Sequence, residues 1–436
     1  MDGKVCFIPG ALPGEEVEVV PLARKRRFDR AVLRRVLRPS PERQDPLCSH
    51  LGICGGCSIQ ALRYEAQVRE KAAQVRECLR RIGGIEAPEH GPPIRSPLLT
   101  AYRNKMEFTF ATREWLVDGP PEVPAPGPAL GLHVPGRFDA IFDIRDCALC
   151  AEVFVRVVSE VRDFARRHGL AAWRSRDDQG LLRHLIVRQG HNTGEVLVGL
   201  VVREASAAFE ELARRLSEAV PSIVGIVLII NRRAATIARG EEEIVLSGRP
   251  YLTERLLDLT YEVGIQSFFQ TNTAGAEALV TALREMLPSR AAADSRSAPG
   301  SGRLLDLYCG AGTLGLALAA DFEHVTGVEQ VPQAVADARR NARRNGLERV
   351  EFIEANVVDW LFAQAPRAVA PARQNVAETG AMPPASLARP FPSPWEGIVV
   401  DPPRAGLHPR ALRALVATKV PWILYVSCNP STLARD

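Results

Sequence analysis

Two short apolar runs near the end of the sequence predict buried parallel strands, and each stops abruptly at a polar turn that contains proline. The first run, 398–400, leads to Asp401, and the second, 422–426, leads to Cys428. A thiolate at a strand end is a candidate nucleophile, and a carboxylate on the neighbouring strand can orient a substrate. A buried structural cysteine is the alternative, but the polar residues that flank the thiol do not suit a core. We therefore expect Asp401 and Cys428 to be catalytic.

A glycine-rich turn earlier in the sequence is typical of a site for a nucleotide-like cofactor. The run 304–308 predicts a buried strand, and Gly310 and Gly312 follow it in a Gly-x-Gly-x-x-Gly pattern. Glu329 lies 19 residues beyond Gly310, a distance at which an acid can reach ribose hydroxyl groups. The glycines alone do not exclude a dinucleotide-binding fold. The carboxylate and thiol described above favour methyl transfer from S-adenosylmethionine, because hydride transfer has no use for them.

Three cysteines in the first part of the chain have the spacing of metal ligands. Cys48, Cys54 and Cys57 fall within ten residues, and two glycines between the last pair permit a sharp turn. A fourth ligand must come from elsewhere, and Cys147 or Cys150 is available. Zinc also accepts four thiolates, but it usually takes them as two close pairs. The three-plus-one pattern therefore favours an iron–sulfur cluster.

The elements that position these groups divide the chain into three predicted domains. Residues 1–46 alternate as short strands with a basic run, which predicts a small β-barrel with a basic rim that suits a polyanion. Residues 47–260 predict an α+β domain around the cysteines, with a helix over 61–82 and then strands that alternate with two helices over 101–260. From 261 to 436 strand–helix units repeat, as in a Rossmann-like α/β fold, here with five strands. The basic run is Arg24, Lys25, Arg26, Arg27, Arg30, Arg34, Arg35 and Arg38, with Asp29 as the single acid within it.

Length and composition indicate a globular protein of several domains, with 436 residues, 46% hydrophobic residues and a net charge of +4. No apolar run is long enough to cross a bilayer, and the N-terminus lacks the apolar core of a signal peptide. We therefore expect a cytoplasmic monomer with no membrane partner, whose nine cysteines serve metal binding or catalysis instead of disulfides. The stretches 288–302 and 363–397 have compositions that predict flexible loops.

Taken together, the motifs resemble the RNA 5-methyluridine methyltransferases, and within them the iron–sulfur branch that modifies uridine in 23S ribosomal RNA. The resemblance covers essentially the whole chain. The motifs that carry it are Phe268-Phe269-Gln270-Thr271-Asn272, the loop from Tyr308 to Thr313, Asp401-Pro402-Pro403-Arg404 and Ser427-Cys428-Asn429-Pro430.

This resemblance implies a role for each part of the chain. The N-terminal domain, residues 1–46, would be a partial TRAM domain, an OB-like β-barrel that binds RNA. Cys48, Cys54, Cys57 and Cys147 would hold a [4Fe-4S] cluster, with Cys150 spare, and Cys428 would be the nucleophile. Contacts with S-adenosylmethionine would fall on Gln270, Tyr308, Thr313, Glu329, Asn356 and Asp401, in addition to the glycines of the turn.

The expected chemistry explains why a thiol is required. Carbon 5 of uracil does not attack a methylsulfonium unaided, but addition of the Cys428 thiolate to carbon 6 gives carbon 5 enolate character. Asp401 would hold the edge of a uracil that is flipped out of any stack. A general base would then remove the proton from carbon 5, and Cys428 would be expelled.

Several alternatives stay open at this stage. The same chemistry on transfer RNA is one. An amino-group methyltransferase would favour an aromatic residue where Arg404 stands, and a 5-methylcytosine enzyme would carry a second cysteine beside the proline of that motif. A binding or assembly factor with an inactive methyltransferase core belongs to a different class.

The ends of the sequence add one more expectation. The family continues past the nucleophile motif through two more strands, which carry a glutamate that serves as the carbon-5 base, and no residue up to Asp436 matches it. The first strand of the TRAM barrel is also unmatched. We therefore expect an unpaired apolar edge beside the strand that ends at Cys428, slow release of the thiol, and impaired turnover with RNA binding retained.

Overall fold

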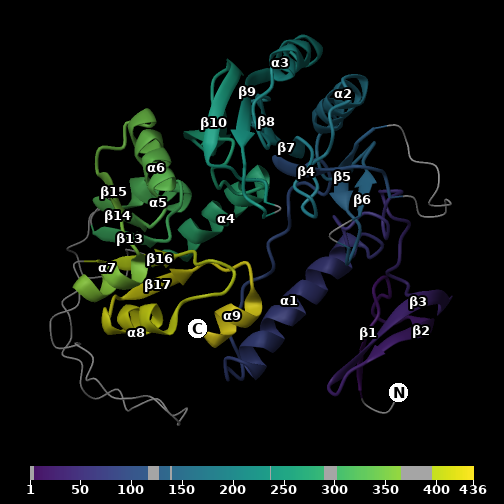
Figure 1. Ribbon diagram of the computed structural model, residues 1–436. Coiled ribbons are helices and arrows are strands. Elements are labelled where there is room, and N and C mark those ends of the chain that lie inside the picture. Colours follow the sequence, from purple (N-terminus) through teal and green to yellow (C-terminus); the bar gives the residue numbers. More distant parts are fainter. Residues whose placement is uncertain (1–3, 116–126, 138–139, 236, 289–301, 365–394) are drawn as a thin grey trace. The chain divides into compact units, whose positions relative to one another are not determined.

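The computed structural model describes residues 4–115, 127–137, 140–235, 237–288, 302–364 and 395–436 (Figure 1). The chain forms two compact units, one of Met1–Ala73 with Pro93–Leu252 and the other of Gln74–Pro92 with Thr253–Asp436. The first unit contains most of both predicted N-terminal domains, and the boundary between those domains stays a prediction. Most of the two stretches predicted as flexible loops lies outside the described residues.

The N-terminal basic run folds into a three-stranded sheet of order β1-β3-β2, formed by β1 (Val5–Phe7), β2 (Glu16–Arg24) and β3 (Phe28–Arg38). The antiparallel pairing of β2 with β3 places Glu18 opposite Arg35. The Glu18 carboxylate therefore pairs with Arg34 at 2.5 Å and with Arg35 at 3.1 Å. Sequence reasoning counted only Asp29, which instead pairs with Lys4 at 2.7 Å.

Part of the predicted basic rim is thus neutralised across the strands. Five basic residues of the run make no ion pair among the described residues: Arg24, Lys25, Arg26, Arg27 and Arg30. A complete barrel stays a prediction, since three strands are described here.

The rest of the first unit is built on a seven-stranded mixed sheet of order β10-β9-β8-β7-β4-β5-β6. Helices α2 and α3 pack on one face of this sheet. Phe108, Phe154 and Phe164 are fully buried in the core between the helices and the sheet. Strands and two helices therefore alternate here, as predicted. The bounds are β4 (Lys105–Ala111), β5 (Ala129–His133), β6 (Ile141–Asp143), α2 (Glu152–Arg167), β7 (Leu182–Gln189), β8 (Val196–Val202), α3 (Ala208–Ala219), β9 (Ile223–Ile230) and β10 (Glu242–Gly248). Helix α1 (Tyr64–Arg81) precedes them in the sequence, and the boundary between the two units falls within it.

The second unit contains a five-stranded, fully parallel sheet of order β15-β14-β13-β16-β17, which confirms the five predicted strands. The chain runs outward from β13 in one direction and then returns to its other side, so the strand order reverses between β13 and β16. The strands are β13 (Arg303–Leu307), β14 (His324–Glu329), β15 (Val350–Glu354), β16 (Gly397–Val400) and β17 (Trp422–Tyr425). A hairpin of β11 (Tyr251–Leu256) and β12 (Leu259–Gly264) precedes them.

Helices cover both faces of the parallel sheet, with α5 and α6 on one side and α7 and α8 on the other (Figure 1). The helices of this unit are α4 (Thr273–Met286), α5 (Thr313–Leu318), α6 (Pro332–Arg344), α7 (Val357–Gln364), α8 (Pro409–Ala417) and α9 (Pro430–Arg435), with a 3-10 turn at Ala319–Asp321. No helix in the described part of the chain combines the length and apolar character needed to cross a membrane.

The two apolar runs that precede the expected catalytic residues differ in burial. All four residues of β16 are buried, as predicted. The prediction of a buried strand is wrong for β17, where Ile423 is 40% exposed, whereas the expectation of an unpaired apolar edge at this strand agrees with the described sheet. The reason is that β17 lies at the edge of the described sheet and pairs with β16 alone.

Candidate active site and metal centre

The carboxyl ends of three parallel strands bring the predicted cofactor residues to one edge of the sheet. Tyr308 follows β13, Glu329 ends β14 and Asp401 follows β16. Backbone hydrogen bonds continue past the strands, from the Tyr308 N–H to the Val328 carbonyl at 3.0 Å and from the Asp401 N–H to the Leu307 carbonyl at 3.3 Å. The three side chains therefore start from adjacent, fixed points.

The glycine-rich loop after β13 holds a strained and closely packed conformation. Tyr308 has a φ of 61°, in the left-handed region that residues with a Cβ rarely adopt, and Gly312 has a φ of 81°. A Cβ atom on Gly312 would lie 2.7 Å from a ring carbon of Phe352. The loop can therefore keep this path only with glycine at position 312. Such strain commonly occurs where backbone must approach a ligand.

Side chains at the ends of the next two strands support this loop. The Glu329 carboxylate accepts hydrogen bonds from the Gly310 N–H at 3.2 Å and from the Gln330 N–H at 2.8 Å. Asn356 donates to the Gln330 side chain at 3.0 Å and accepts from the Val358 N–H at 3.0 Å, which caps α7. Glu329 is thus held beside the loop as an acceptor, and Asn356 is held beside Gln330, the next residue along the chain. A carboxylate in this position suits the hydroxyl groups of a nucleoside.

The segment that contains Gln270 is anchored to the same loop. The Tyr261 hydroxyl, on β12, donates to the Thr313 carbonyl at 3.2 Å, and its ring packs against Phe269 with 5.6 Å between ring centroids. Asn272 caps α4 by accepting a backbone N–H bond at 2.8 Å. Gln270 lies between these two anchors, so the structure brings its segment to the end of the glycine-rich loop, at Thr313.

Cys428 is exposed, in a polar turn between β17 and α9, as the sequence predicted. The Ser427 hydroxyl donates to the Asn429 carbonyl at 3.0 Å and accepts from the Asn429 N–H at 3.1 Å. The Asn429 side chain then caps α9 by accepting from the Ser431 N–H at 3.1 Å. This turn fixes the backbone on both sides of the thiol and leaves the thiol accessible.

Asp306 is a further acidic group of the site that sequence reasoning did not single out. It is fully buried in β13, one carboxyl oxygen accepts from the Gly315 N–H at 2.9 Å, and the other has no partner among the described residues. Burial, and then the charges of Asp401 and Glu329, raise the pKa of Asp306 to about 7. Burial also raises the pKa of Asp401 to about 6. The signal in the sequence that could have identified Asp306 is that it is the single acidic residue within an apolar strand.

These carboxyl groups create a negative potential beneath the loop. Asp306, Glu329 and Asp401 are close enough for the last two to disfavour ionisation of the first. A cation bound there would reduce this repulsion. The arrangement therefore suits a ligand that carries positive charge, such as a sulfonium with an ammonium group.

Four of the predicted metal ligands line one cavity in the first unit: Cys48, Cys54, Cys57 and Cys147. Cys150 is buried and is absent from the lining of that cavity. Burial raises the pKa of the Cys54 and Cys57 thiols. A hydrogen bond from Cys150 lowers the pKa of the Cys147 thiol to about 6. The four thiols that the resemblance implies are thus brought together, and such a donor set fits an iron–sulfur cluster or zinc.

A second donor set shares one of these thiols. The ligand atoms of Cys48, His50 and Asp146 lie within 4.8 Å of one another. The His50 Nδ1 atom is 3.0 Å from the Asp146 carboxylate, so these two side chains already pair with each other. All nine cysteines lie in the described residues, and none forms a disulfide there.

Comparisons with known proteins connect this arrangement to RNA modification. Residues 193–436 match the family model described as tRNA (Uracil-5-)-methyltransferase. A protein of Chlorobaculum tepidum described as an uncharacterized RNA methyltransferase is 35% identical to this chain, over 100% of the chain and 85% of the relative. A Porphyromonas gingivalis protein of the same description is 34% identical, over 100% of the chain and 89% of the relative.

A solved structure is similar over nearly the same extent. It is the Pyrococcus abyssi tRNA (uracil-54, C5)-methyltransferase in complex with S-adenosyl-L-homocysteine. The TM-score is 0.69 and the identity 26%, and the alignment covers 99% of this chain and 87% of that chain.

Proposed function

This chain belongs to the tRNA (uracil-5-)-methyltransferase family and is an RNA methyltransferase, and we propose that it methylates carbon 5 of a uridine through a covalent bond to Cys428. The methyl donor in this proposal is S-adenosylmethionine. The observation that carries the proposal is the pairing of two features in one parallel sheet. An acidic, glycine-rich rim suited to a sulfonium lies at β13, β14 and β16, and an exposed thiol follows the adjacent strand β17.

The proposed reaction uses the chain's own residues in a fixed order. Asp401 accepts a hydrogen bond from the edge of a uracil that has left its stack, and so orients the ring. The Cys428 thiolate forms a bond to carbon 6, which moves an electron pair toward carbon 5. Bound S-adenosylmethionine supplies the methyl group that carbon 5 takes. A base then removes the carbon-5 proton, the ring double bond re-forms, and the thiolate leaves.

The residues that would bind the donor are those at the rim. Glu329 presents a carboxylate beside the loop, Asn356 presents an amide, and Gly310 and Gly312 let the backbone approach. Gln270 and Tyr308 would complete the site. Asp306 would favour the positive charge of the bound donor from below the loop.

We extend the proposal to a [4Fe-4S] cluster held by Cys48, Cys54, Cys57 and Cys147. The support is that these four thiols, and no other cysteine, line one cavity. Such a cluster would crosslink two segments, one around residues 48–57 and one around residue 147. In the sequence, α1, β4, β5 and β6 lie between these segments. A zinc ion on the same thiols is the alternative, and metal analysis separates the two.

For the RNA substrate we propose 23S ribosomal RNA, with the N-terminal sheet as part of a TRAM domain that contacts RNA. Arginine and lysine residues of that sheet without ion pairs among the described residues support a polyanion contact. Transfer RNA is the second candidate. It is favoured by the description of the matching family and by the name of the similar solved structure.

The test is methyl transfer from radiolabelled S-adenosylmethionine to unmodified transcripts of 23S ribosomal RNA and of transfer RNA. We expect label in 5-methyluridine from the ribosomal transcript, and none with Cys428→Ala. Label only in transfer RNA would identify transfer RNA as the substrate and would leave the proposed reaction unchanged. Label in a different nucleoside, or none with either transcript, would refute the proposed reaction.

A further inference from the structure

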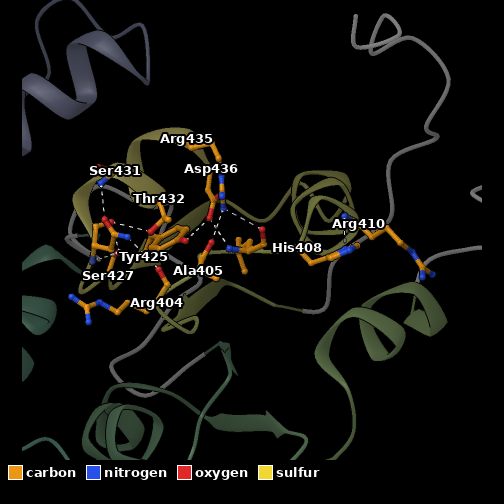
Figure 2. A network of polar contacts seen from close by, with 12 residues as sticks. Arg404, Ala405, His408, Arg410, Tyr425, Ser427, Ser431, Thr432, Arg435 and Asp436 are labelled. Carbon is orange, nitrogen blue, oxygen red and sulfur yellow. Dashed lines mark hydrogen bonds and ion pairs between the residues drawn. The ribbon is translucent and has the colours of Figure 1, made fainter. Parts of the chain in front are cut away.

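The segment that follows Cys428 is tied to the loop that follows Asp401 by a buried carboxylate (Figure 2). Asp436, directly after α9, has a side chain that is 2% exposed. One of its carboxylate oxygens accepts two hydrogen bonds at 2.7 Å each, one from the Leu407 N–H and one from the Tyr425 hydroxyl. Leu407 belongs to the loop after Asp401, and Tyr425 ends the strand that leads to Cys428.

Two more side chains of the same segment hold this loop. Arg435 donates to the Ala405 carbonyl at 3.0 Å and pairs with the other Asp436 oxygen at 2.6 Å. Asn429, next to Cys428, donates to the Arg404 carbonyl at 3.3 Å. The loop from 404 to 407 is therefore bonded through three of its residues to the segment that carries the thiol.

The loop is shaped for this close approach. Gly406 has a φ of +78°, and a Cβ atom there would lie 2.5 Å from an Asp436 carboxylate oxygen and 2.6 Å from the Arg435 guanidinium. Only glycine lets the backbone pass so near this ion pair.

The carboxylate of Asp436 is kept ionised and lies near the cofactor loop as well. Although its burial acts in the opposite direction, hydrogen bonds from Leu407, Tyr425 and Arg435 lower the pKa of Asp436. Burial raises the pKa of Tyr308 first, and the charge of Asp436 adds to this effect. The charge of Asp436 therefore acts on all three segments that the proposed reaction uses.

We propose that Tyr425, Arg435 and Asp436 form a latch that holds the Asp401 loop in register with Cys428. This inference rests on the proposed function, because it concerns the distance between the group that orients the uracil and the group that attacks it. None of the three residues of the latch is assigned a contact with substrate, so they are positioning residues. A displacement of about 1 Å at such a distance can cost about 10²-fold in rate.

The test measures covalent bond formation, not turnover. A 23S ribosomal RNA transcript that contains 5-fluorouridine is mixed with the full chain and S-adenosylmethionine, and the adduct is quantified on a denaturing gel. Fluorine replaces the carbon-5 proton and cannot be removed by a base, so the thiol stays bound after methyl transfer. The adduct rate at saturating RNA, the RNA concentration for half-saturation, the affinity for S-adenosylmethionine and the thermal unfolding midpoint are measured.

Three variants form a graded series. Asp436→Ala leaves the Leu407 N–H and the Tyr425 hydroxyl without an acceptor, and we expect about a 10- to 100-fold lower adduct rate. Asp436→Asn keeps the side-chain volume but removes the pairing with Arg435, and Tyr425→Phe removes a single donor, so both should lose less. The control is Arg344→Gln, which breaks an ion pair of 2.7 Å with Glu262. Neither residue belongs to the latch or to the proposed site, so this variant should keep the wild-type rate.

The latch is supported if Asp436→Ala lowers the adduct rate most and the other two variants lower it less. The RNA concentration for half-saturation and the affinity for S-adenosylmethionine should stay within about threefold of wild type. Wild-type adduct rates in Asp436→Asn and Tyr425→Phe would overturn the latch alone. Equal losses of rate, cofactor affinity and thermal stability would also overturn it, since they would indicate a general structural role. Absence of adduct with the wild-type chain would instead overturn the proposed function.

Discussion

Substitution of Gly312 by alanine should disrupt the candidate cofactor loop by a calculable amount. A Cβ in the left-handed region costs about 1–2 kcal/mol. The same Cβ would lie 2.7 Å from the Phe352 ring and 3.2 Å from Ala338, a clash of the kind that costs about 1–3 kcal/mol in a packed interior. The sum is about 2–5 kcal/mol. If the loop keeps its path the loss appears in the free energy of unfolding, and if the loop shifts it appears in cofactor affinity.

The assay therefore measures both quantities, by denaturant unfolding and by calorimetric binding of S-adenosylmethionine, and adds the two losses. Gly346→Ala is the matched control, because Gly346 has a φ of +63° but nothing within 4 Å of its added Cβ. It should lose only the backbone part, about 1–2 kcal/mol, and bind the cofactor normally. Phe352→Leu should recover part of the loss in the Gly312→Ala background, because it removes the clashing ring.

A combined loss for Gly312→Ala within about 0.5 kcal/mol of that for Gly346→Ala would refute the reasoning. It would mean that the loop accommodates the Cβ without cost, and that its close packing is not required for cofactor binding.

The remaining predictions concern catalysis, metal and pH. Cys428→Ala should lower methyl transfer at least about 10³-fold with cofactor affinity unchanged, whereas Glu329→Ala should weaken S-adenosylmethionine binding about 10- to 100-fold through lost charge-assisted hydrogen bonds. Calorimetry measures the binding and single-turnover kinetics the methyl transfer, and near-normal turnover of Cys428→Ala would exclude covalent catalysis. Anaerobically purified chain should be brown with about four irons per molecule, and Cys54→Ser should lose that iron while Cys6→Ser keeps it; stoichiometric zinc without iron would contradict the cluster. Burial raises the pKa of Asp401 to about 6, so its ionised, hydrogen-bond-accepting form is lost as the pH falls through 6. The rate of methyl transfer should therefore rise with pH around 6, and a rise that persists in Asp401→Asn would show that another group titrates.

Local patterns in the sequence were sufficient to predict the parallel sheet and its functional edge. Each of the five strands is a short apolar run, and the residues that end these runs, such as Glu329 and Asp401, fall at the carboxyl edge because the strands are parallel. The exposed setting of Cys428 followed from its polar neighbours. Burial was harder to predict than the presence of a strand. The run at 422–425 is as apolar as a buried strand, and only the expectation of an unpaired edge beside Cys428, which came from the resemblance, pointed to its half-exposure in the described sheet.

Features that depend on contacts between distant segments escaped the sequence. Spacing alone leaves Cys147 and Cys150 equivalent as candidate fourth ligands. The resemblance implied Cys147, and it is Cys147 that lines the cavity with Cys48, Cys54 and Cys57. Glu18 neutralises two arginines across a strand pairing that the order of residues does not reveal.

Asp436 has no sequence signal of its own at all. An aspartate just after a helix is ordinary, and its role appears only when Leu407 and Tyr425 are found bonded to one carboxylate oxygen. The φ of Tyr308 is likewise a property of the folded loop.

The most direct test of the proposed chemistry is peptide mass spectrometry of the chain after reaction with the 5-fluorouridine transcript and S-adenosylmethionine. After digestion of protein and RNA, we predict that the peptide containing Cys428 carries one 5-fluorouridine nucleotide together with one added methyl group. Methylated RNA without any adduct at Cys428, or an adduct located on a different residue, would contradict the account.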